Sequence, residues 1–248
     1  MKKVIGVLLL AAMIVSLAAC GSSDTPEQDT SSSLIAEVAS MESENTPRET
    51  SETESIENNK TEQDSKILIA YFSRVGNTEW EDGVDVVTSA SLNDVDGEYA
   101  GNAQLLAQMA QQATGGDLFL IQTEASYPSD YRETTDQAKV EQNENARPAL
   151  ATHVENMDSY DTIVLIYPNW WGALPQPVCT FLEEYDFAGK TILPLCTHAG
   201  SQMGSSEYDI ESLCPKATVL DGLAVSGSSA ASAQSDVENW LNNAGISK

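Results

Sequence analysis

Basic residues are scarce in this chain. Its 248 residues include 12 Lys and Arg against 38 Asp and Glu, which gives a formal net charge of −26 at pH 7. A surface this acidic repels the phosphates of nucleic acids and the headgroups of anionic lipids. The composition therefore argues against a nucleic-acid-binding protein and against direct docking on an anionic membrane, while positively charged protein partners remain open.

Histidine is also rare. The two histidines, His153 and His198, have no neighbouring Cys or His at the spacing of metal ligands, so the sequence predicts no metal site. His153 sits in a polar stretch, which predicts a structural or solvent-facing role. His198 follows an apolar run.

The chain has only 4 cysteines. Cys179, Cys196 and Cys214 lie on or beside apolar faces, where a cysteine is most often a small core residue. Three thiols cannot all pair within one chain. A disulfide between Cys196 and Cys214 is conceivable outside the cell, and the sequence does not decide its presence.

A long apolar run occurs only at the start. Lys2 and Lys3 precede residues 4–19, which are apolar apart from Ser16, and Leu17-Ala18-Ala19-Cys20 places small residues before a cysteine. This pattern resembles a bacterial lipoprotein signal, 1–19. The resemblance implies cleavage before Cys20, lipid attached to Cys20, and a protein held by that lipid alone at the extracytoplasmic face of the cell membrane. A plain secretory signal or an uncleaved anchor is the alternative.

Residues 20–65 are expected to be a spacer. From residue 21 onward they contain 12 acidic and 2 basic residues and no aromatic residue. Such a segment buries too little apolar surface to offset the entropy of ordering, so we expect a disordered acidic linker rich in Ser, Thr and Glu. Residues 66–248 then form one domain. It carries −18 of the net charge once the linker's −10 and the signal's +2 are removed.

Strand-like and helix-like stretches alternate through residues 66–248, which predicts an α/β fold with a parallel sheet covered by helices on both faces. The expected strands are Lys66–Phe72, Asp117–Ile121, Thr162–Tyr167, Lys190–Cys196 and Thr218–Val225. The expected helices are Asn102–Ala113, Ser129–Asn143, Gln176–Tyr185, Met203–Leu213 and Ala231–Asn243.

Three loops follow three apolar strands, and the first is Ser73-Arg74-Val75-Gly76-Asn77-Thr78. In a parallel sheet, ligands bind at the carboxyl ends of the strands. A short polar loop at that position can wrap a phosphate, because Gly76 lets the backbone come close and the terminal hydroxyls donate hydrogen bonds. Taken alone, the segment is equally compatible with an ordinary turn from strand to helix.

The second loop, Tyr167-Pro168-Asn169-Trp170-Trp171-Gly172-Ala173-Leu174-Pro175, contains paired tryptophans. Exposed indoles are costly in water, and a flat aromatic ligand would cover them. Backbone groups of Asn169 and Gly172 are placed to reach the edge of such a ligand. The alternative is that the tryptophans fill the core or a partner surface, and it applies more readily to Trp171 than to Trp170.

The third loop is Cys196-Thr197-His198-Ala199-Gly200-Ser201. Together the three loops resemble those of a flavodoxin, and the resemblance covers nearly all of 66–248. It is closest to the flavodoxins with paired tryptophans in the second loop. It implies a doubly wound five-stranded parallel sheet in the order 2-1-3-4-5, with FMN bound where the strand order reverses.

The resemblance also implies site residues. The phosphate would be held by Ser73, Arg74, Val75, Gly76, Asn77 and Thr78. The flavin ring would be flanked by Trp170 and Trp171, with Pro168, Asn169 and Gly172 shaping that wall. The opposite side would be closed by Thr197, His198, Gly200 and Ser201. His198 is either a residue that tunes the flavin potential or a loop histidine with no redox role.

One departure concerns residues at about 79–100, which separate the first loop from the helix that should follow it. This insert has the composition of an excursion or short hairpin, and it brings Trp80 and several carboxylates to the mouth of the site. Gly101-Asn102-Ala103 echoes Gly76-Asn77-Thr78. We therefore expect loop and helix to rejoin in space, with Asn102 capping the helix near the phosphate.

The first functional hypothesis is an FMN-binding redox protein that carries electrons or reduces a small acceptor; whether it is an enzyme stays open. The alternative is a lipoprotein that uses this scaffold for binding or interaction without redox turnover. A hydrolase has little support, because Ser201 and His198 have no Gly-x-Ser-x-Gly motif beside them.

Overall fold

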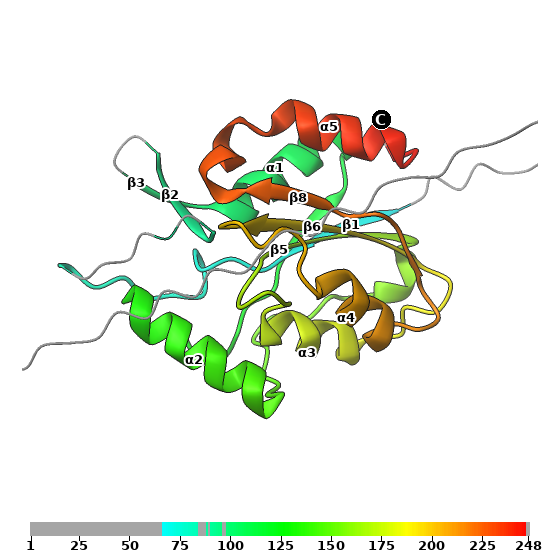
Figure 1. Ribbon diagram of the computed structural model, residues 1–248. Coiled ribbons are helices and arrows are strands. Elements are labelled where there is room, and N and C mark those ends of the chain that lie inside the picture. Colours follow the sequence, from blue (N-terminus) through cyan, green and yellow to red (C-terminus); the bar gives the residue numbers. More distant parts are fainter. Residues whose placement is uncertain (1–65, 84–87, 89, 96–97, 247–248) are drawn as a thin grey trace, which may run out of the picture. The chain divides into compact units, whose positions relative to one another are not determined.

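The computed structural model describes residues 66–83, 88, 90–95 and 98–246, and the sheet strands alternate with helices along that part of the chain (Figure 1). The main-sheet strands are β1 (Ile67–Tyr71), β4 (Asp117–Leu120), β5 (Thr162–Pro168), β6 (Thr191–His198), β7 (Thr218–Val219) and β8 (Leu223–Ser226). The helices are α1 (Asn102–Thr114), α2 (Tyr131–Glu144), α3 (Gln176–Glu184), α4 (Ser206–Leu213) and α5 (Gln234–Asn243), with 3₁₀ turns η1 (Met157–Ser159) and η2 (Gly227–Ser232).

The main sheet is parallel throughout and runs β4-β1-β5-β6, with β7 and β8 both beside β6. Ala70 in β1, for example, pairs with Phe119 on one side and Leu165 on the other. This arrangement confirms the expected order 2-1-3-4-5. The first strand and its neighbour β5 lie at the centre, so their loops meet at one edge of the sheet.

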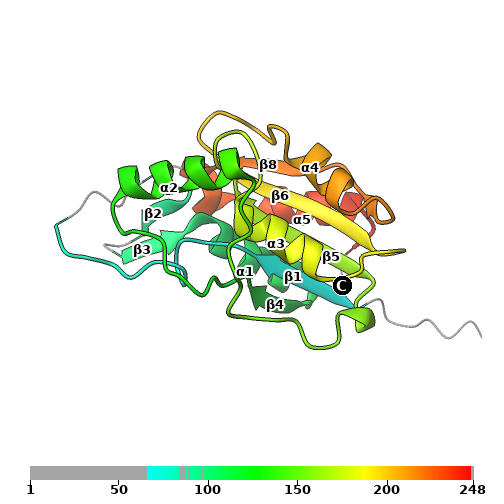
Figure 2. The ribbon, with the colours of Figure 1, turned by 90° about the horizontal axis from the view of Figure 1, so that it is seen from below.

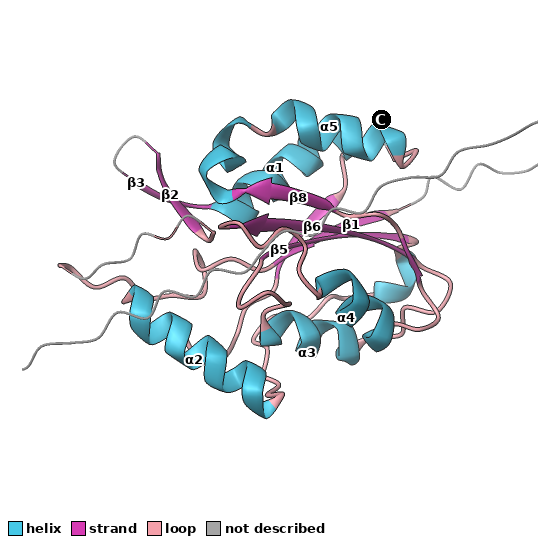
Figure 3. Cartoon of the chain, viewed as in Figure 1, coloured by secondary structure: helices cyan, strands magenta, loops and turns pink. Residues whose placement is uncertain are grey.

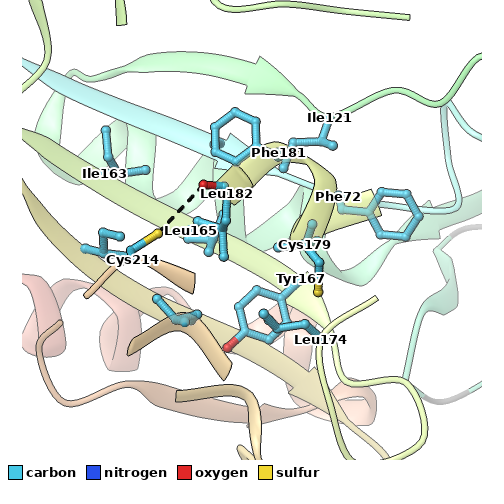
Figure 4. Packing of buried hydrophobic residues seen from close by; sticks show 14 of the residues in the cluster. Phe72, Ile121, Ile163, Leu165, Tyr167, Leu174, Cys179, Phe181, Leu182 and Cys214 are labelled. Atoms are coloured by element: carbon cyan, nitrogen blue, oxygen red, sulfur yellow. Dashed lines mark hydrogen bonds between the residues drawn. The ribbon is translucent and has the colours of Figure 1, made fainter. Parts of the chain in front are cut away.

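Side chains of the central strands alternate between two buried layers, because successive residues of a strand face opposite sides of the sheet. Ile69 and Val164 pack with Leu106 of α1 and Val237 of α5. The opposite layer includes Leu165, and Figure 4 shows Ile163, Leu165, Tyr167, Phe181 and Leu182 packed together there. Helices α1 and α5 therefore cover one face and α3 and α4 cover the other (Figures 1 and 2).

The last expected strand is divided. Residues 220–222 separate β7 from β8, and both short strands pair with β6. Gly222 lies so close to Met203 that a Cβ there would be 2.4 Å from the Met203 Cε atom, and its N–H donates to Glu207 Oε1 at 2.8 Å. The chain thus turns toward α4 where a single strand was expected.

Three helices begin later than expected. Helix α4 starts at Ser206, because Gln202 and Gly204 have positive φ values of 53° and 58° that no α-helix accommodates. Helix α5 starts at Gln234, after η2. Helix α2 starts at Tyr131, capped by Asp130, whose Oδ1 accepts from the N–H groups of Arg132 and Glu133.

The insert contains the antiparallel hairpin β2 (Leu92–Val95) and β3 (Glu98–Gly101), separate from the main sheet (Figure 3). The expected lipoprotein signal and linker, 1–65, lie outside the described residues. Among the helices of residues 66–246 that the structure describes, none is long and apolar enough to cross a bilayer.

Candidate functional site

A cavity of about 390 Å³ opens at the carboxyl ends of β1, β5 and β6. Its volume lies within the usual range for small-molecule sites. Residues from the three expected loops meet there with residues of the insert and of α2. The lining residues are Arg74, Thr88, Ala90, Ser91, Tyr131, Thr134, Thr135, Ala138, Asn169, Trp170, Trp171, Gly172, Ala199 and Ser201.

The loop after β1 is held rigidly by its own side chains. Asn77 Nδ2 donates to the carbonyl oxygens of Ser73 at 2.9 Å and Ile121 at 3.0 Å, and Asn77 Oδ1 accepts from the N–H and hydroxyl of Thr123. The Ser73 hydroxyl accepts from the N–H of Val75 at 3.2 Å. Asn77 thus fixes the loop to the segment that follows β4, with both ends of its amide engaged. This geometry therefore disfavours a direct contact between the Asn77 side chain and a phosphate.

Arg74 is the one residue of this loop that lines the cavity. Its Nη2 donates to the carbonyl oxygens of Pro128 at 2.8 Å and Ser129 at 2.9 Å, and its guanidinium lies 5.2 Å from the ring centre of Trp80. Desolvation lowers the pKa of Arg74 to about 10, opposed by the nearby Asp130 carboxylate. Arg74 therefore stays charged at neutral pH and places a fixed positive charge on the cavity wall.

The start of α1 adjoins this loop in space, as expected. A Cβ atom on Gly101 would lie 2.1 Å from the Ser73 hydroxyl oxygen, so only glycine permits this approach. The cap position of the helix is Gly101, which offers no side chain, and α1 begins with Asn102. The first turn of a 13-residue helix thus points its N–H groups toward the neighbourhood of Ser73.

The expectation that Asn102 caps α1 is wrong. Asn102 is the first helical residue, and its buried Oδ1 accepts from Asn93 Nδ2 of the hairpin at 2.9 Å, while its backbone N–H donates to Ser91 O. No side-chain hydrogen bond caps the helix start, and the side-chain oxygen of Asn102 is engaged by the hairpin. Asn102 instead fastens the insert to α1.

The two tryptophans differ in their surroundings. Trp170 is half-buried and packs edge-to-face against Phe72 at 5.3 Å and Tyr127 at 5.2 Å between ring centres, and its Nε1 donates to Ser91 Oγ. Trp171 is 54% exposed, and its Nε1 donates to the carbonyl oxygen of Thr135 in α2 at 2.9 Å. The alternative that a tryptophan fills the core thus applies more to Trp170 than to Trp171. The sequence had favoured the opposite assignment.

The loops after β5 and β6 are joined to each other. The N–H of Asn169 donates to Thr197 O at 2.7 Å, and Asn169 Nδ2 donates to Gln202 O at 2.9 Å. The carbonyl oxygen of Gly172 accepts from the N–H of Ser205 at 2.8 Å. Pro168 is buried as the last residue of β5 and does not line the cavity. These bonds make one continuous wall from the two loops.

Only part of the loop after β6 faces the cavity. Ser201 lines it, and so does Ala199, which was not among the residues expected there. Thr197 and His198 are buried at the end of β6, and His198 Nδ1 accepts from the N–H of Gly200 at 2.9 Å. The imidazole of His198 therefore supports the turn at Gly200, whose φ is +113°, rather than lining the cavity.

Several buried polar atoms near this edge have no hydrogen-bond partner among the described residues. They are Thr78 Oγ1, Asn169 Oδ1 and Thr197 Oγ1, from the segments at the ends of β1, β5 and β6. Buried polar groups are normally paired, since an unpaired one costs free energy. Of these residues Asn169 lines the cavity, and an unpaired atom in an aromatic-walled cavity fits a flat ligand that carries polar groups.

Most of one wall was not foreseen from the sequence. Tyr131, Thr134, Thr135 and Ala138 of α2 line the cavity, and their spacing places them along one helical face. The signal was present as a stripe of small and hydroxyl residues at helical spacing. It was missed because such a stripe is weakly apolar and resembles a solvated face.

The cysteines and the second histidine have structural surroundings. Cys179, Cys196 and Cys214 are free and buried, so the disulfide left open in the sequence analysis is not formed. Burial raises the pKa of Cys196 to about 12. His153 is exposed and pairs with Glu184, as its polar surroundings predicted.

Comparison with known proteins supports the fold. The sequence profile described as flavodoxin matches residues 95–244, a range that includes α1 and the paired tryptophans but not the loop after β1. No curated protein matches the chain significantly.

Two crystal structures of proposed flavoproteins are similar. One is from Bacteroides eggerthii DSM 20697, with 27% identity, a TM-score of 0.56 and coverage of 73% of this chain and 99% of that one. The other, from Bacteroides uniformis ATCC 8492, has 26% identity, a TM-score of 0.55 and coverage of 72% and 98%. With the profile match over more than half of its length, the chain belongs to the flavodoxin family.

Proposed function

We propose that this protein binds FMN in the cavity and acts as a redox protein. The observation that carries the proposal is an aromatic-walled cavity at the carboxyl edge of a flavodoxin-type sheet, with the unpaired buried Asn169 Oδ1 in its lining and the unpaired Thr78 Oγ1 in the loop after β1. A flavin offers both the flat ring that would cover Trp171 and the hydrogen-bonding groups that would satisfy such atoms.

The phosphate would sit at the start of α1. A helix start without a side-chain cap favours an anion through the N–H groups of its first turn and through its dipole. Gly101 brings this helix start against the Ser73 hydroxyl. Ser73 and Thr78 would donate to the phosphate oxygens, with the backbone at Val75 and Gly76 completing the loop. Arg74 would add a positive charge from the cavity wall.

The ring would lie between the loop after β5 and helix α2. Trp171 is held against α2 by its bond to Thr135 O, and Lys139 Nζ lies 5.2 Å from its ring centre. Asn169 and Gly172 would face one edge of the ring, and Ser201 would close the far side. Thr197, His198 and Gly200 would act from behind this wall by fixing its shape.

The redox chemistry would belong to the flavin, which can accept and donate electrons. Among the residues that line the cavity in the described part of the chain, none is Asp, Glu, His or Cys. The residues around the cavity would therefore bind and orient the flavin and limit water. Apart from the Tyr131 phenol, the described lining offers no ordinary side-chain acid or base, which favours electron transfer over a reaction that needs one.

We also propose that Cys20 carries lipid and that residues 20–65 hold the domain away from the extracytoplasmic face of the membrane. The support is the sequence pattern around Leu17-Ala18-Ala19-Cys20. In a bacterial host, the wild-type chain should fractionate with membranes and incorporate labelled fatty acid. Cys20→Ala should abolish labelling; labelling that persists would contradict the anchor.

The redox proposal is tested by purifying the full chain in detergent and recording its absorbance spectrum. Flavin bands, with FMN released on denaturation and identified by mass, are the expected result. A colourless chain that also takes up no added FMN would contradict the proposal and favour the interaction protein considered as the alternative.

A further inference from the structure

Asn169 is held in a single orientation between two loops. It begins the loop after β5, lines the cavity and is buried, with 6% of its surface exposed. Its Nδ2 donates to the carbonyl oxygen of Gln202 at 2.9 Å. A carbonyl oxygen can only accept, so the nitrogen of the amide must face Gln202 and the assignment of Nδ2 and Oδ1 is fixed.

The surroundings leave this side chain little room to rotate. A Cβ on Gly204 would lie 3.0 Å from Asn169 Nδ2 and 2.1 Å from the carbonyl oxygen of Gly172. The backbone N–H of Asn169 is itself bonded to Thr197 O. Asn169 Oδ1 is therefore a fixed, buried acceptor, and it has no hydrogen-bond partner among the described residues.

We propose that Asn169 Oδ1 accepts a hydrogen bond from the N3–H group of the flavin ring, an inference that rests on the proposed function. The oxidised isoalloxazine ring has one N–H donor, at N3, whereas its other polar ring atoms accept. A fixed acceptor at the ring edge can therefore be satisfied by that group alone.

The position of Asn169 along the sheet indicates that it faces the flavin ring and not the ribityl hydroxyls. The phosphate end lies after β1, beside Ser73 and the start of α1. Asn169 follows β5 and is bonded to Gln202, beyond β6, which is the next strand away from β1. The part of the ligand that reaches this pair is the end opposite the phosphate, which in FMN is the ring.

The test compares FMN with 3-methyl-FMN, in which the N3 donor is replaced by a methyl group. Binding is followed by fluorescence titration of the full chain in detergent. The wild-type protein should bind FMN about tenfold more tightly, as the loss of one buried hydrogen bond predicts. Asn169→Ala should bind both flavins within about twofold of each other, because the acceptor is gone.

Two further variants make the test specific. Asn169→Leu keeps the volume of the side chain without its polar atoms and should also lose the preference, which covers the case that the alanine variant does not fold. Asn243→Ala removes an exposed amide at the end of α5 and should keep the full preference.

The possible negative results of this test contradict different statements. Equal binding of the two flavins by the wild-type chain would overturn the role of Asn169, and so would a preference that persists in both Asn169 variants. Binding of neither flavin would overturn the proposed function together with this inference.

Discussion

The indole Nε1 of Trp170 donates a hydrogen bond of 3.1 Å to the hydroxyl of Ser91, 79 residues earlier in the chain. Ser91 also accepts, through its carbonyl oxygen, the N–H of Asn102 at the start of α1. One residue of the insert thus contacts both the tryptophan loop and the helix start. The insert is therefore part of the candidate site rather than a distant excursion.

Replacing Ser91 tests this connection. Ser91→Ala leaves the indole N–H of Trp170 without its acceptor, so the free energy of unfolding should fall by about 1 kcal/mol. FMN affinity should fall severalfold because the tryptophan loop is less well held. Denaturant unfolding and flavin titration measure the two effects. Ser229→Ala, on an exposed part of η2, is the matched control, and equal effects from both variants would contradict the coupling.

Gly101→Ala tests whether the loop after β1 and the start of α1 bind the phosphate together. The new Cβ would lie 2.1 Å from the Ser73 hydroxyl and would force the helix start and the loop apart. FMN affinity should fall by about tenfold, as expected for the loss of phosphate hydrogen bonds. Riboflavin, which lacks the phosphate, should bind unchanged. An equal loss for both ligands would place the phosphate elsewhere.

Trp171→Phe tests the exposed wall. It removes the hydrogen bond to Thr135 O and part of the stacking surface, so FMN affinity should fall severalfold while stability changes by less than about 1 kcal/mol. Trp240→Phe is the matched control, because the Nε1 of Trp240 also donates to a backbone carbonyl, that of Asp221, but on α5. FMN affinity that is unaffected by Trp171→Phe would remove Trp171 from the site.

The buried free cysteines make the stability of the folded protein depend on pH. Burial raises the pKa of Cys179 to about 11 and those of Cys196 and Cys214 to about 12, from an ordinary value near 9. Above pH 9 the unfolded chain loses thiol protons that the folded chain keeps. Stability is therefore complete below pH 9 and falls as pH rises toward 12, by up to about 1.4 kcal/mol per pH unit for each thiol.

Measuring the free energy of unfolding between pH 7 and pH 10.5 checks this dependence. Cys214→Ala should make the decline above pH 9 shallower, whatever it does to stability at pH 7. The same decline in the variant and the wild type would show that the Cys214 thiol does not contribute.

The sheet order could be predicted because apolar strands such as residues 67–71 and 162–168 are continuous in sequence and end in short polar loops. The details of the site could not, because they depend on contacts between distant residues. Asn102 resembles a cap by its position, yet Asn93 of the hairpin holds its side chain. Trp170 resembles an exposed ring by its loop, yet Phe72 and Tyr127 pack against it.

Flavin titration of the full chain, freed of any bound cofactor, tests the central claim most directly. We predict saturable binding of one FMN per chain, with quenching of flavin fluorescence as the ring enters the aromatic-walled cavity. FMN fluorescence that stays unchanged at micromolar protein would contradict the claim that this cavity is a flavin site.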